Sequence, residues 1–346
     1  MSRRFLLFGT LPYAYEILRP LQAAARERGD EVAWYLEPGA GKFLLPGEQR
    51  LDTVHDVVAW QPDAVFVPGN WVPDFFPGVK VQVFHGFGIE KKGHFRIRGW
   101  FDLYCTHGPL TTQPFQAMAA ADGSFAVRET GWPKMDALFA SRAEPGLQEV
   151  FSNPEKPIIL YAPTFSKSLT SVPDLAGRIF ALSEEGPWNW LVKFHPKMDP
   201  AWVDRFRAAS NGQLQVSMDA NIASLLHTAD AMLTDTSSVA AEFLLLDKAV
   251  ATFRNASPGP HYLDFNEPGQ LERIVHRALA PDDDHRLAMR KYADNMHPFR
   301  DTKSSQRVIE ATCKFIDQGT AERLQPKPLN LWRRLRMRLK AGYFRF

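Results

Sequence analysis

Residues 233–248 read LTDTSSVAAEFLLLDK, and this stretch carries the pattern on which the fold depends. The run DAMLTD, residues 230–235, is typical of a buried strand, and VAAEFLLLD, residues 239–247, has the composition of an apolar helix. Polar residues stand at the junction, where a helix N-terminus needs acceptors for its free N–H groups. The stretch therefore predicts a strand that passes directly into a helix, with Ser237 or Ser238 as the first cap.

The same alternation of apolar runs and helix-patterned segments extends along the whole chain. RFLLFGT at 4–10 predicts a first strand, AYEILRPLQAAARERG at 14–29 a helix kinked at Pro20 and closed by Gly29, and EVAWYLE the next strand. Further strands are predicted in DAVFVPG, VKVQVFHG, FDLYCTHG, PIILYAPTF, WNWLVKFHP, LQVSM, DAMLTDT and KAVATF. Strands that alternate with helices predict βαβ units and a parallel sheet.

One segment interrupts the alternation. FASRAEPGLQEVFSNPEKP, residues 139–157, has no apolar period and carries proline and glycine, so we expect the domain boundary there. The expected class is α/β, with two doubly wound Rossmann-like domains that face a cleft. We divide the chain into an N-terminal domain, a C-terminal domain and a basic tail at 1–145, 146–318 and 319–346.

Composition narrows the class of protein. Lys and Arg total 41 against 39 Asp and Glu among 346 residues, and a formal charge of +2 argues against a general nucleic-acid coat. Cys105 and Cys313 form neither a disulfide framework nor a zinc motif and fit a reducing, cytosolic compartment. No run of about 18 apolar residues occurs, and the short apolar run after Arg4 reads as a strand rather than a secretion signal.

Ligands of open parallel sheets bind beyond the carboxyl ends of the strands, so polar residues at those ends are the candidates. In VFHGFGIEKKG, residues 83–93, His85 directly follows an apolar strand, Gly86 lets a ligand approach the backbone, and Lys91 and Lys92 lie just beyond. An imidazole at this place can act as a general base, because its ordinary pKa lies near neutrality. A structural turn histidine is the alternative.

A second strand end carries a cation and an imidazole together. In WLVKFHPK, residues 190–197, Lys193 and His195 alternate with apolar residues and are expected on one face, with Pro196 ending the strand. Such a pair suits an oxygen-rich anionic group, although solvated edge residues would show the same pattern. The strand-to-helix junction described first adds the hydroxyls of Thr236, Ser237 and Ser238. Hydroxyls at a helix N-terminus can bind phosphate, and the alternative is that they only cap the helix.

Two further segments follow strands but read individually as turns. TGWPKMDAL, residues 130–138, contains the cap-type residue Asp136, and YAPTF, residues 161–165, places Thr164 at the end of a strand. Asp235, at the end of DAMLTD, is expected to orient its own loop rather than to bind a metal.

In order along residues 82–310, these motifs resemble those of the CDP-glycerol glycerophosphotransferase family, the teichoic-acid primases and polymerases. HG…KKG, GWPKMD, YAPTF, KFHP, TDTSS and FRDTKSSQRV resemble the family's H-G-x3-K-K, G-Y-P-R-x-D, Y-A-P-T-W, K-x-H-P, T-D-Y-S-S and D-G-x-x-S-x-R-V. Six ordered motifs are far more specific than any one of them. The first eighty residues match only in general pattern.

The resemblance implies a GT-B fold, with a nucleotide cleft between two Rossmann-like domains, and transfer of a polyol phosphate from a CDP-linked donor to a hydroxyl of a lipid-linked or growing glycan, with release of CMP. By motif position, His85 is expected as the base for the acceptor hydroxyl and His195 at the donor phosphates. Lys193, Thr236, Ser237 and Ser238 are expected to bind the donor phosphates, with Gly86, Thr164, Asp235 and Asp136 in supporting roles. No metal and no obligatory cofactor are expected.

Departures from the family pattern put the donor's polyol in doubt. One extra residue separates the HG pair from Lys91 and Lys92, Thr236 stands where the family has Tyr, and Phe165 where it has Trp. Asp301-Thr302-Lys303 replaces the usual Asp-Gly-Lys. CDP-ribitol or another activated group is therefore an alternative to CDP-glycerol.

The C-terminal stretch LNLWRRLRMRLKAGYFRF, residues 329–346, interleaves arginines with leucines and aromatic residues. A basic amphipathic segment of this kind is typical of a helix that lies on an anionic membrane surface. We therefore expect peripheral association with the inner face of the cytoplasmic membrane, and no nucleic-acid partner. The alternative is a helix that packs across the two domains with its basic face in solvent.

Three other functions are alternatives to this transfer. A nucleotide-sugar glycosyltransferase of the same fold would consume a different donor. A sugar-nucleotide 2-epimerase would resemble D-S-G-G where this chain has Asp235-Thr236-Ser237-Ser238, which counts against it. A non-catalytic protein that only binds a ligand is the third alternative. Such a chain would be expected to have lost His85 or His195, and both are present. A hydrolase is excluded because the chain contains no G-x-S-x-G nucleophile elbow.

Overall fold

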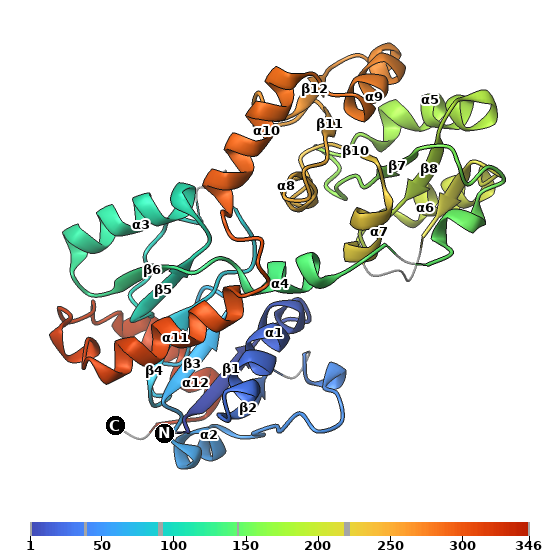
Figure 1. Cartoon of the computed structure of the whole chain (residues 1–346). Coiled ribbons are helices and arrows are strands. Elements are labelled where there is room, and N and C mark those ends of the chain that lie inside the picture. The colour runs from blue at the N-terminus through green and yellow to red at the C-terminus, as the bar shows by residue number, and fades with distance from the viewer. Residues whose placement is uncertain (1, 38–39, 89–92, 144, 218–221, 345–346) are drawn as a thin grey trace. The chain divides into compact units, whose positions relative to one another are not determined.

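The computed structural model describes residues 2–37, 40–88, 93–143, 145–217 and 222–344. The chain forms two compact units, which are both visible in Figure 1. Unit 1 consists of Met1–Leu138 together with Asn295–Phe346, and unit 2 is Phe139–Asp294.

The described residues of unit 1 form a six-stranded parallel sheet in the order β2-β1-β3-β4-β5-β6. The strands are β1 (Arg4–Gly9), β2 (Glu31–Leu36), β3 (Ala64–Val67), β4 (Val79–Gln82), β5 (Leu103–Thr106) and β6 (Ala126–Glu129). Their side chains are buried on both faces in the central strands, as in Ala64–Val67, which explains why these segments read as continuous apolar runs. The chain reverses direction of winding between β1 and β3, which is the switch point where ligands bind in such sheets.

Helices cover both faces of this sheet. They are α1 (Ala14–Glu27), α2 (Val54–Trp60), α3 (Pro109–Asp122), α4 (Pro133–Ala140, which runs into unit 2), α11 (Ser304–Asp317) and α12 (Leu331–Ala341), with short 3-10 turns at Gly41–Phe43 and Ala321–Arg323. Helix α1 is continuous through Pro20 and ends before Gly29, whose φ of +84° is in the left-handed region that favours glycine. Helices α1 and α11 pack side by side on the sheet (Figure 1).

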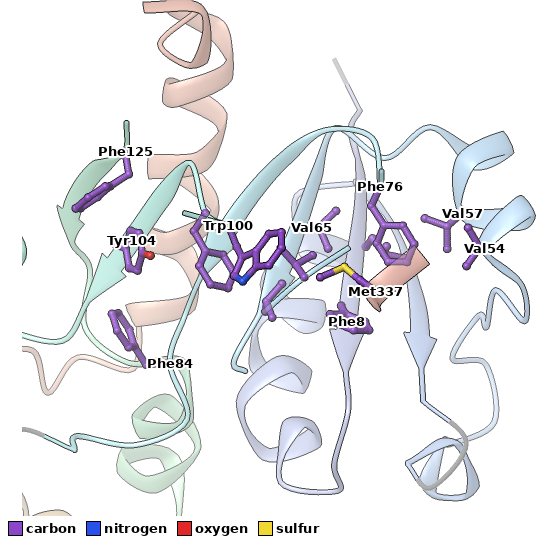
Figure 2. Packing of buried hydrophobic residues seen from close by; sticks show 14 of the residues in the cluster. Phe8, Val54, Val57, Val65, Phe76, Phe84, Trp100, Tyr104, Phe125 and Met337 are labelled. Carbon is purple, nitrogen blue, oxygen red and sulfur yellow. The ribbon is translucent and has the colours of Figure 1, made fainter. Parts of the chain in front are cut away.

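The core of unit 1 joins residues from both of its chain segments. Figure 2 shows Phe8, Val65 and Phe76 packed with Met337, which comes from α12 near the end of the chain. Met337 is only 9% exposed, so the C-terminal helix is part of the folded unit rather than a free tail. Burial of such side chains stabilises the unit by about 1.5–3 kcal/mol each.

Unit 2 repeats the architecture with a different strand order, β12-β11-β10-β7-β8-β9, again parallel among the described residues. The strands are β7 (Ile158–Tyr161), β8 (Asn189–Val192), β9 (Leu214–Val216), β10 (Ala231–Thr234), β11 (Val250–Phe253) and β12 (Leu263–Phe265). The helices are α5 (Val172–Glu185), α6 (Pro200–Ala208), α7 (Ile222–Thr228), α8 (Val239–Leu244), α9 (Leu271–Leu279) and α10 (Asp283–Met296), with 3-10 turns at Leu147–Val150 and Pro268–Gln270. The switch point lies between β7 and β10.

The division into units differs from the one expected at 145/146 and 318/319. Residues 295–318, which were expected in the C-terminal domain, belong to unit 1. The physical reason is visible at α11, which packs on α1 and whose Asp317 forms an ion pair with Arg3 at 2.5 Å. The segment 319–346 is likewise not a separate tail, since its helix α12 contributes to the core of unit 1.

Candidate functional site

The candidate residues lie at the carboxyl ends of central strands in both sheets. In unit 1, His85 follows β4, next to the ends of β3 and β1. In unit 2, Asp235 and the following hydroxyls come after β10, and His195 follows β8, on either side of β7. Lys91 and Lys92 lie outside the described residues.

The imidazole of His85 is fixed by the neighbouring strand end. Its Nδ1 lies 3.1 Å from the carbonyl oxygen of Pro68, the residue that follows β3. A carbonyl oxygen only accepts hydrogen bonds, so Nδ1 carries the proton and donates it. In the neutral ring, Nε2 is then the basic nitrogen, and the side chain is exposed to solvent. This is the tautomer that a general base requires.

The surroundings of His85 leave room for a ligand and supply a second ring. The ring of Tyr13 lies 5.6 Å from that of His85, centroid to centroid, and burial raises the pKa of the Tyr13 hydroxyl, which therefore stays protonated. A Cβ built on Gly86 would meet no atom within 4 Å. Packing within the unit would therefore allow a side chain at this position.

Behind His85 lies a buried aromatic cluster that supports the loop. Phe84 has a φ of +59°, and its carbonyl accepts a hydrogen bond from Nε1 of Trp132 at 3.4 Å. The rings of Phe84 and Phe87 lie 5.1 and 5.2 Å from that of His107, which is fully buried. Burial holds the pKa of His107 well below its usual range, so this imidazole is neutral. The cluster acts as a rigid platform for the exposed histidine.

Asp136 has a structural role that links two distant motifs. Its carboxylate accepts hydrogen bonds from the backbone N–H groups of Ser304 and Ser305, at 2.8 and 2.7 Å, and so caps α11 rather than its own helix. Nearby, Arg307 binds Asp301 through two hydrogen bonds of 2.8 and 3.0 Å. The GWPKMD and FRDTKSSQRV motifs therefore meet in unit 1 as a clamp on the start of α11.

Asp235 orients the loop that follows the first strand of unit 2. Its carboxylate accepts from the backbone N–H of Thr164 at 2.9 Å and from both the N–H and the hydroxyl of Ser171, at 2.9 and 3.0 Å. The side chain is fully buried, and burial raises its pKa while these hydrogen bonds oppose the rise. Within the described part of the chain, no three His, Cys, Asp or Glu side chains are grouped so as to hold a metal ion.

The hydroxyl groups that follow Asp235 differ in the hydrogen bonds that they form. The Thr236 hydroxyl accepts a hydrogen bond from the N–H of Ala256 at 3.0 Å. Ser238 occupies the N-cap of α8, but contrary to the expected cap its side chain makes no capping hydrogen bond, and it is exposed. Because α8 has only six residues, its dipole adds little, and the available groups are the Ser237 and Ser238 hydroxyls themselves.

His195 is fixed in the opposite tautomer to His85. Its Nδ1 accepts a hydrogen bond from the backbone N–H of Lys197 at 3.0 Å, so in the neutral ring the proton is on Nε2. Burial and then the charge of Lys197 lower the pKa of His195, which favours this neutral form. The exposed Nε2–H is a hydrogen-bond donor suited to a phosphate oxygen. His195 thus donates a hydrogen bond without carrying a full charge.

Phe165 and Lys197 complete this site, although neither was among the site residues expected from the sequence, where Phe165 was noted only as a departure from the family pattern. The Phe165 ring stacks on the His195 ring at 4.4 Å with an interplanar angle of 29°, and the Lys197 ammonium lies 5.7 Å from the Phe165 ring centre. Lys193 is half-buried, and its backbone N–H donates to the carbonyl of Tyr161 at 3.0 Å. The available signals were the second lysine of KFHPK and the aromatic residue that ends YAPTF.

Comparison with known proteins gives a family and a fold. The family model for CDP-Glycerol:Poly(glycerophosphate) glycerophosphotransferase matches residues 101–314, more than half of the chain. No curated protein sequence matches at a significant level.

Solved structures resemble the chain over nearly its full length. A variant of the wall teichoic acid polymerase TagF soaked with CDPG is 15% identical with a TM-score of 0.63 and covers 91% of this chain and 89% of its own. A putative UDP-N-acetylglucosamine 2-epimerase from Listeria monocytogenes has 13% identity, a TM-score of 0.68 and coverage of 92% and 98%. The S. aureus MnaA–UDP complex has 14% identity, a TM-score of 0.62 and coverage of 92% and 97%. At these identities the likeness shows the fold, and the expected GT-B architecture of two Rossmann-like domains is confirmed.

Proposed function

Because the chain belongs to the CDP-glycerol:poly(glycerophosphate) glycerophosphotransferase family, and is a transferase of that kind, we propose that it moves a polyol phosphate from a CDP-linked donor to a hydroxyl of a lipid-linked or cell-surface glycan, releasing CMP. The observation that carries this proposal is the opposite tautomer of its two motif histidines. His85 presents a basic Nε2, and His195 presents an Nε2–H. One is suited to remove a proton and the other to bind a phosphate oxygen.

The proposed reaction is an in-line displacement at phosphorus. Nε2 of His85 accepts the proton of the acceptor hydroxyl, while the oxygen of that hydroxyl attacks the β-phosphorus of the donor. The bond from that phosphorus to the bridging oxygen breaks, and CMP leaves with the electron pair. The imidazolium of His85 remains bonded to the Pro68 carbonyl through Nδ1, so protonation disturbs no existing contact. Positioning and charge stabilisation supply most of the rate enhancement in such transfers.

The donor phosphates are proposed to bind the residues of unit 2. The Nε2–H of His195 and the hydroxyls of Ser237 and Ser238 donate hydrogen bonds, and Thr236 adds a hydroxyl whose oxygen already accepts from Ala256. Positive charge comes from Lys197 and Lys193 rather than from His195. Asp235 and Thr164 act indirectly, because the Asp235 carboxylate holds the Thr164 loop from which Phe165 reaches the imidazole.

A membrane location is proposed from α12. Its inner side is fixed to unit 1 by Met337 and by Arg338, which pairs with Asp74 at 3.1 Å. Its outer side exposes an apolar stripe, whose members Leu331, Trp332, Leu335 and Leu339 are 67%, 84%, 46% and 61% exposed. An apolar stripe beside arginines is suited to lie in the headgroup region of an anionic bilayer, where a lipid-linked acceptor would be found. Among the described helices, none is both long and apolar enough to cross a bilayer.

The donor is tested by a thermal-shift screen against CDP-glycerol, CDP-ribitol, CMP, UDP-sugars and GDP-sugars. A ligand that binds only the folded protein raises the apparent Tm. Stabilisation confined to the cytidine compounds, followed by CMP release on addition of a glycan acceptor, supports the proposal. A selective response to UDP-sugars or GDP-sugars contradicts it and favours a glycosyltransferase or an epimerase.

The membrane contact is tested by sedimentation with vesicles of phosphatidylcholine and phosphatidylserine. Deleting the helix is unsuitable, because Met337 and Tyr343 belong to the core of unit 1. The variant L331S/L335S/L339S keeps those contacts and is expected to lose binding. The control is L287S, since Leu287 is 67% exposed on α10 in unit 2. Equal binding of the triple variant and the wild-type protein would refute the contact.

A further inference from the structure

Two hydroxyl groups lie beside His85 at the switch point of the unit 1 sheet. Thr10 and Tyr13 belong to the loop between β1 and α1, and β1 pairs with β3 (Figure 1). The Tyr13 ring lies 5.6 Å from the ring of His85, between centroids. The loop therefore brings a phenol next to the histidine that is proposed as the base.

These hydroxyls and the imidazole lie around the same two residues after β3. A Cβ built on Gly69 would lie 3.9 Å from both Oγ1 of Thr10 and the hydroxyl oxygen of Tyr13. The carbonyl of Pro68, the residue before Gly69, accepts the hydrogen bond from Nδ1 of His85 at 3.1 Å. Because glycine has no side chain, residue 69 leaves the space next to both hydroxyls open.

The Tyr13 hydroxyl has a proton to offer a ligand. Burial raises the pKa of Tyr13, and a hydrogen bond with the Thr10 side chain opposes the rise, so the group is protonated at neutral pH. A hydroxyl has one proton and two acceptor positions, so an oxygen that accepts from Thr10 can still donate its own proton. Among the described residues, Tyr13 has no other hydrogen-bonding partner for its side chain. Although Tyr13 is the N-cap residue of α1, its side chain makes no capping bond.

Tyr15, two residues later, shows how a structural tyrosine is held in the same region. Its hydroxyl donates to the carbonyl of Ala40 at 2.8 Å, its ring lies 5.2 Å from that of Trp34, and the side chain is buried. Tyr13 is half-buried, and its hydroxyl bonds to no main-chain group of the described residues. The fold therefore depends on the hydroxyl of Tyr15, whereas that of Tyr13 joins no second element to the loop.

The chemistry of the transfer indicates which acceptor oxygen the Tyr13 proton would meet. The attacking oxygen loses electron density as it bonds to phosphorus, so a hydrogen bond donated to it would weaken in the transition state and slow the reaction. A hydroxyl on the neighbouring carbon does not react. A hydrogen bond donated to that second hydroxyl orients the acceptor without this cost.

We propose that Tyr13 is an acceptor-binding residue whose hydroxyl donates a hydrogen bond to a second acceptor hydroxyl, adjacent to the one that His85 deprotonates. Thr10 is a positioning residue, since it acts through Tyr13. The preferred acceptor then carries hydroxyls on neighbouring carbon atoms, as a polyol or a sugar ring does. This inference rests on the proposed transfer reaction and adds to it a residue that selects the acceptor.

The test compares two acceptors that differ in one hydroxyl, glycerol 1-phosphate and 3-hydroxypropyl phosphate. Both present the same terminal hydroxyl, and only glycerol 1-phosphate has a hydroxyl on the neighbouring carbon. Release of CMP from CDP-glycerol, and in parallel from CDP-ribitol, gives kcat/KM for each acceptor. The wild-type protein is expected to favour glycerol 1-phosphate by about 2–10-fold, the usual range for one uncharged hydrogen bond.

The variant Y13F removes the hydroxyl and keeps the ring. It is expected to lower kcat/KM for glycerol 1-phosphate by about 2–10-fold and to affect 3-hydroxypropyl phosphate far less, so that the preference disappears. A structural defect would lower kcat/KM for both acceptors alike. T10V is expected to reduce the preference in part, and T10S, which keeps the hydroxyl, is expected to retain it.

The matched control is Y15F, because it removes a tyrosine hydroxyl two residues away that bonds to the chain itself. Y15F is expected to lower the Tm and to leave the preference between the two acceptors unchanged. If Y13F does not fold, as judged by its circular dichroism spectrum, the comparison of T10V with T10S carries the test.

The outcomes separate this inference from the proposal on which it rests. Equal kcat/KM for the two acceptors in the wild-type protein, or a preference that survives in Y13F, would overturn the role of Tyr13 while leaving the transfer reaction intact. Equal loss of the preference in Y13F and Y15F would overturn it as well. CMP release with a glycan acceptor but with neither small acceptor would overturn the inference alone, and no CMP release with any acceptor would overturn both.

Discussion

The carbonyl oxygen of Pro68 lies 3.1 Å from Nδ1 of His85 and thereby determines which nitrogen of that ring is basic. The residue after one strand thus sets the chemistry of a residue after the next strand. Proline contributes no backbone N–H here, so its carbonyl is the only main-chain polar group that it offers to the imidazole.

Replacing His85 by Gln is expected to lower kcat about 10²–10⁴-fold, the usual range for loss of a general base. Glutamine can still donate a hydrogen bond to Pro68 but cannot accept a proton. The donor-induced rise in Tm should be unchanged, since the proposed donor site is in unit 2. Steady-state kinetics with a thermal-shift titration checks both parts, and weaker donor binding with unchanged kcat would reverse the roles.

Replacing Ser238 by Ala is expected to weaken donor binding without lowering stability. An N-cap serine normally contributes about 0.5–2 kcal/mol, but the Ser238 side chain makes no capping bond. The comparison variant is Thr53→Ala, because the Thr53 hydroxyl accepts from the N–H of Asp56 in a true capping box. Urea unfolding should show a loss of stability for Thr53→Ala alone, and a similar loss for both would refute the distinction.

Replacing Phe165 by Leu should reduce kcat/KM by about fivefold, equivalent to the ~1 kcal/mol of a ring-stacking contact. The ring of Phe165 stacks on His195 and restrains its orientation, so its loss leaves the Nε2–H less well aimed. Phe165→Trp keeps a ring and should retain activity. A Trp variant as impaired as the Leu variant would show that the stack does not position the histidine.

Replacing Asp136 by Ala should lower the free energy of unfolding by about 1–2 kcal/mol, because two backbone N–H groups at the start of α11 lose their acceptor. The control is Asp283→Ala, whose carboxylate is fully exposed beside Arg286. Denaturant unfolding of both variants measures the difference. A value for Asp136→Ala no larger than the control would mean that α11 does not depend on this cap.

Stability should fall as the pH falls from about 6.5 to 4. Burial lowers the pKa of His297 from 6.5 to about 4, and Nε2 of this ring accepts from the N–H of Trp132 at 2.9 Å. Above pH 6.5 the His297 ring is neutral in both the folded and the unfolded state. Between pH 6.5 and about 4 this histidine binds a proton in the unfolded chain but not in the folded protein, so protonation favours unfolding. His297 alone contributes about 3 kcal/mol to this loss at pH 4. His297→Gln keeps the acceptor and should flatten the curve measured by urea unfolding, and an unchanged slope would contradict the assignment.

Most of the strands and the strand-end motifs were predictable from the sequence because each depends on local pattern, whereas β6 and β12, short strands that contain charged residues, were not predicted. Buried parallel strands are continuous apolar runs, and His85, His195 and Asp235 each follow such a run. What local pattern does not contain is a partner far along the chain. Asp136 reads as a cap for its own turn, yet it caps a helix 168 residues later. For the same reason the second domain boundary was wrong, since only packing on α1 assigns α11 to unit 1.

The tautomers could not be predicted either. They depend on the Pro68 carbonyl and the Lys197 N–H, main-chain groups whose direction no side-chain pattern encodes. Ser238 was expected to cap α8 because serine is favoured at that position, but its hydroxyl is not used there. Lys91 and Lys92 lie outside the described residues, and the part expected of them stays a prediction.

The clamp between Asp136 and the start of α11 has a consequence for the order in which the protein forms on the ribosome. Unit 2 is a single stretch, Phe139–Asp294, and can complete its sheet as soon as that stretch has emerged. The first segment of unit 1 is synthesised earlier, but the unit cannot complete its fold until Asn295–Phe346 has been made. That segment supplies α11, which packs on α1, and the core residue Met337. The part of the chain made earliest is therefore finished last, and nascent chains shorter than about 300 residues should expose its apolar surface to chaperones.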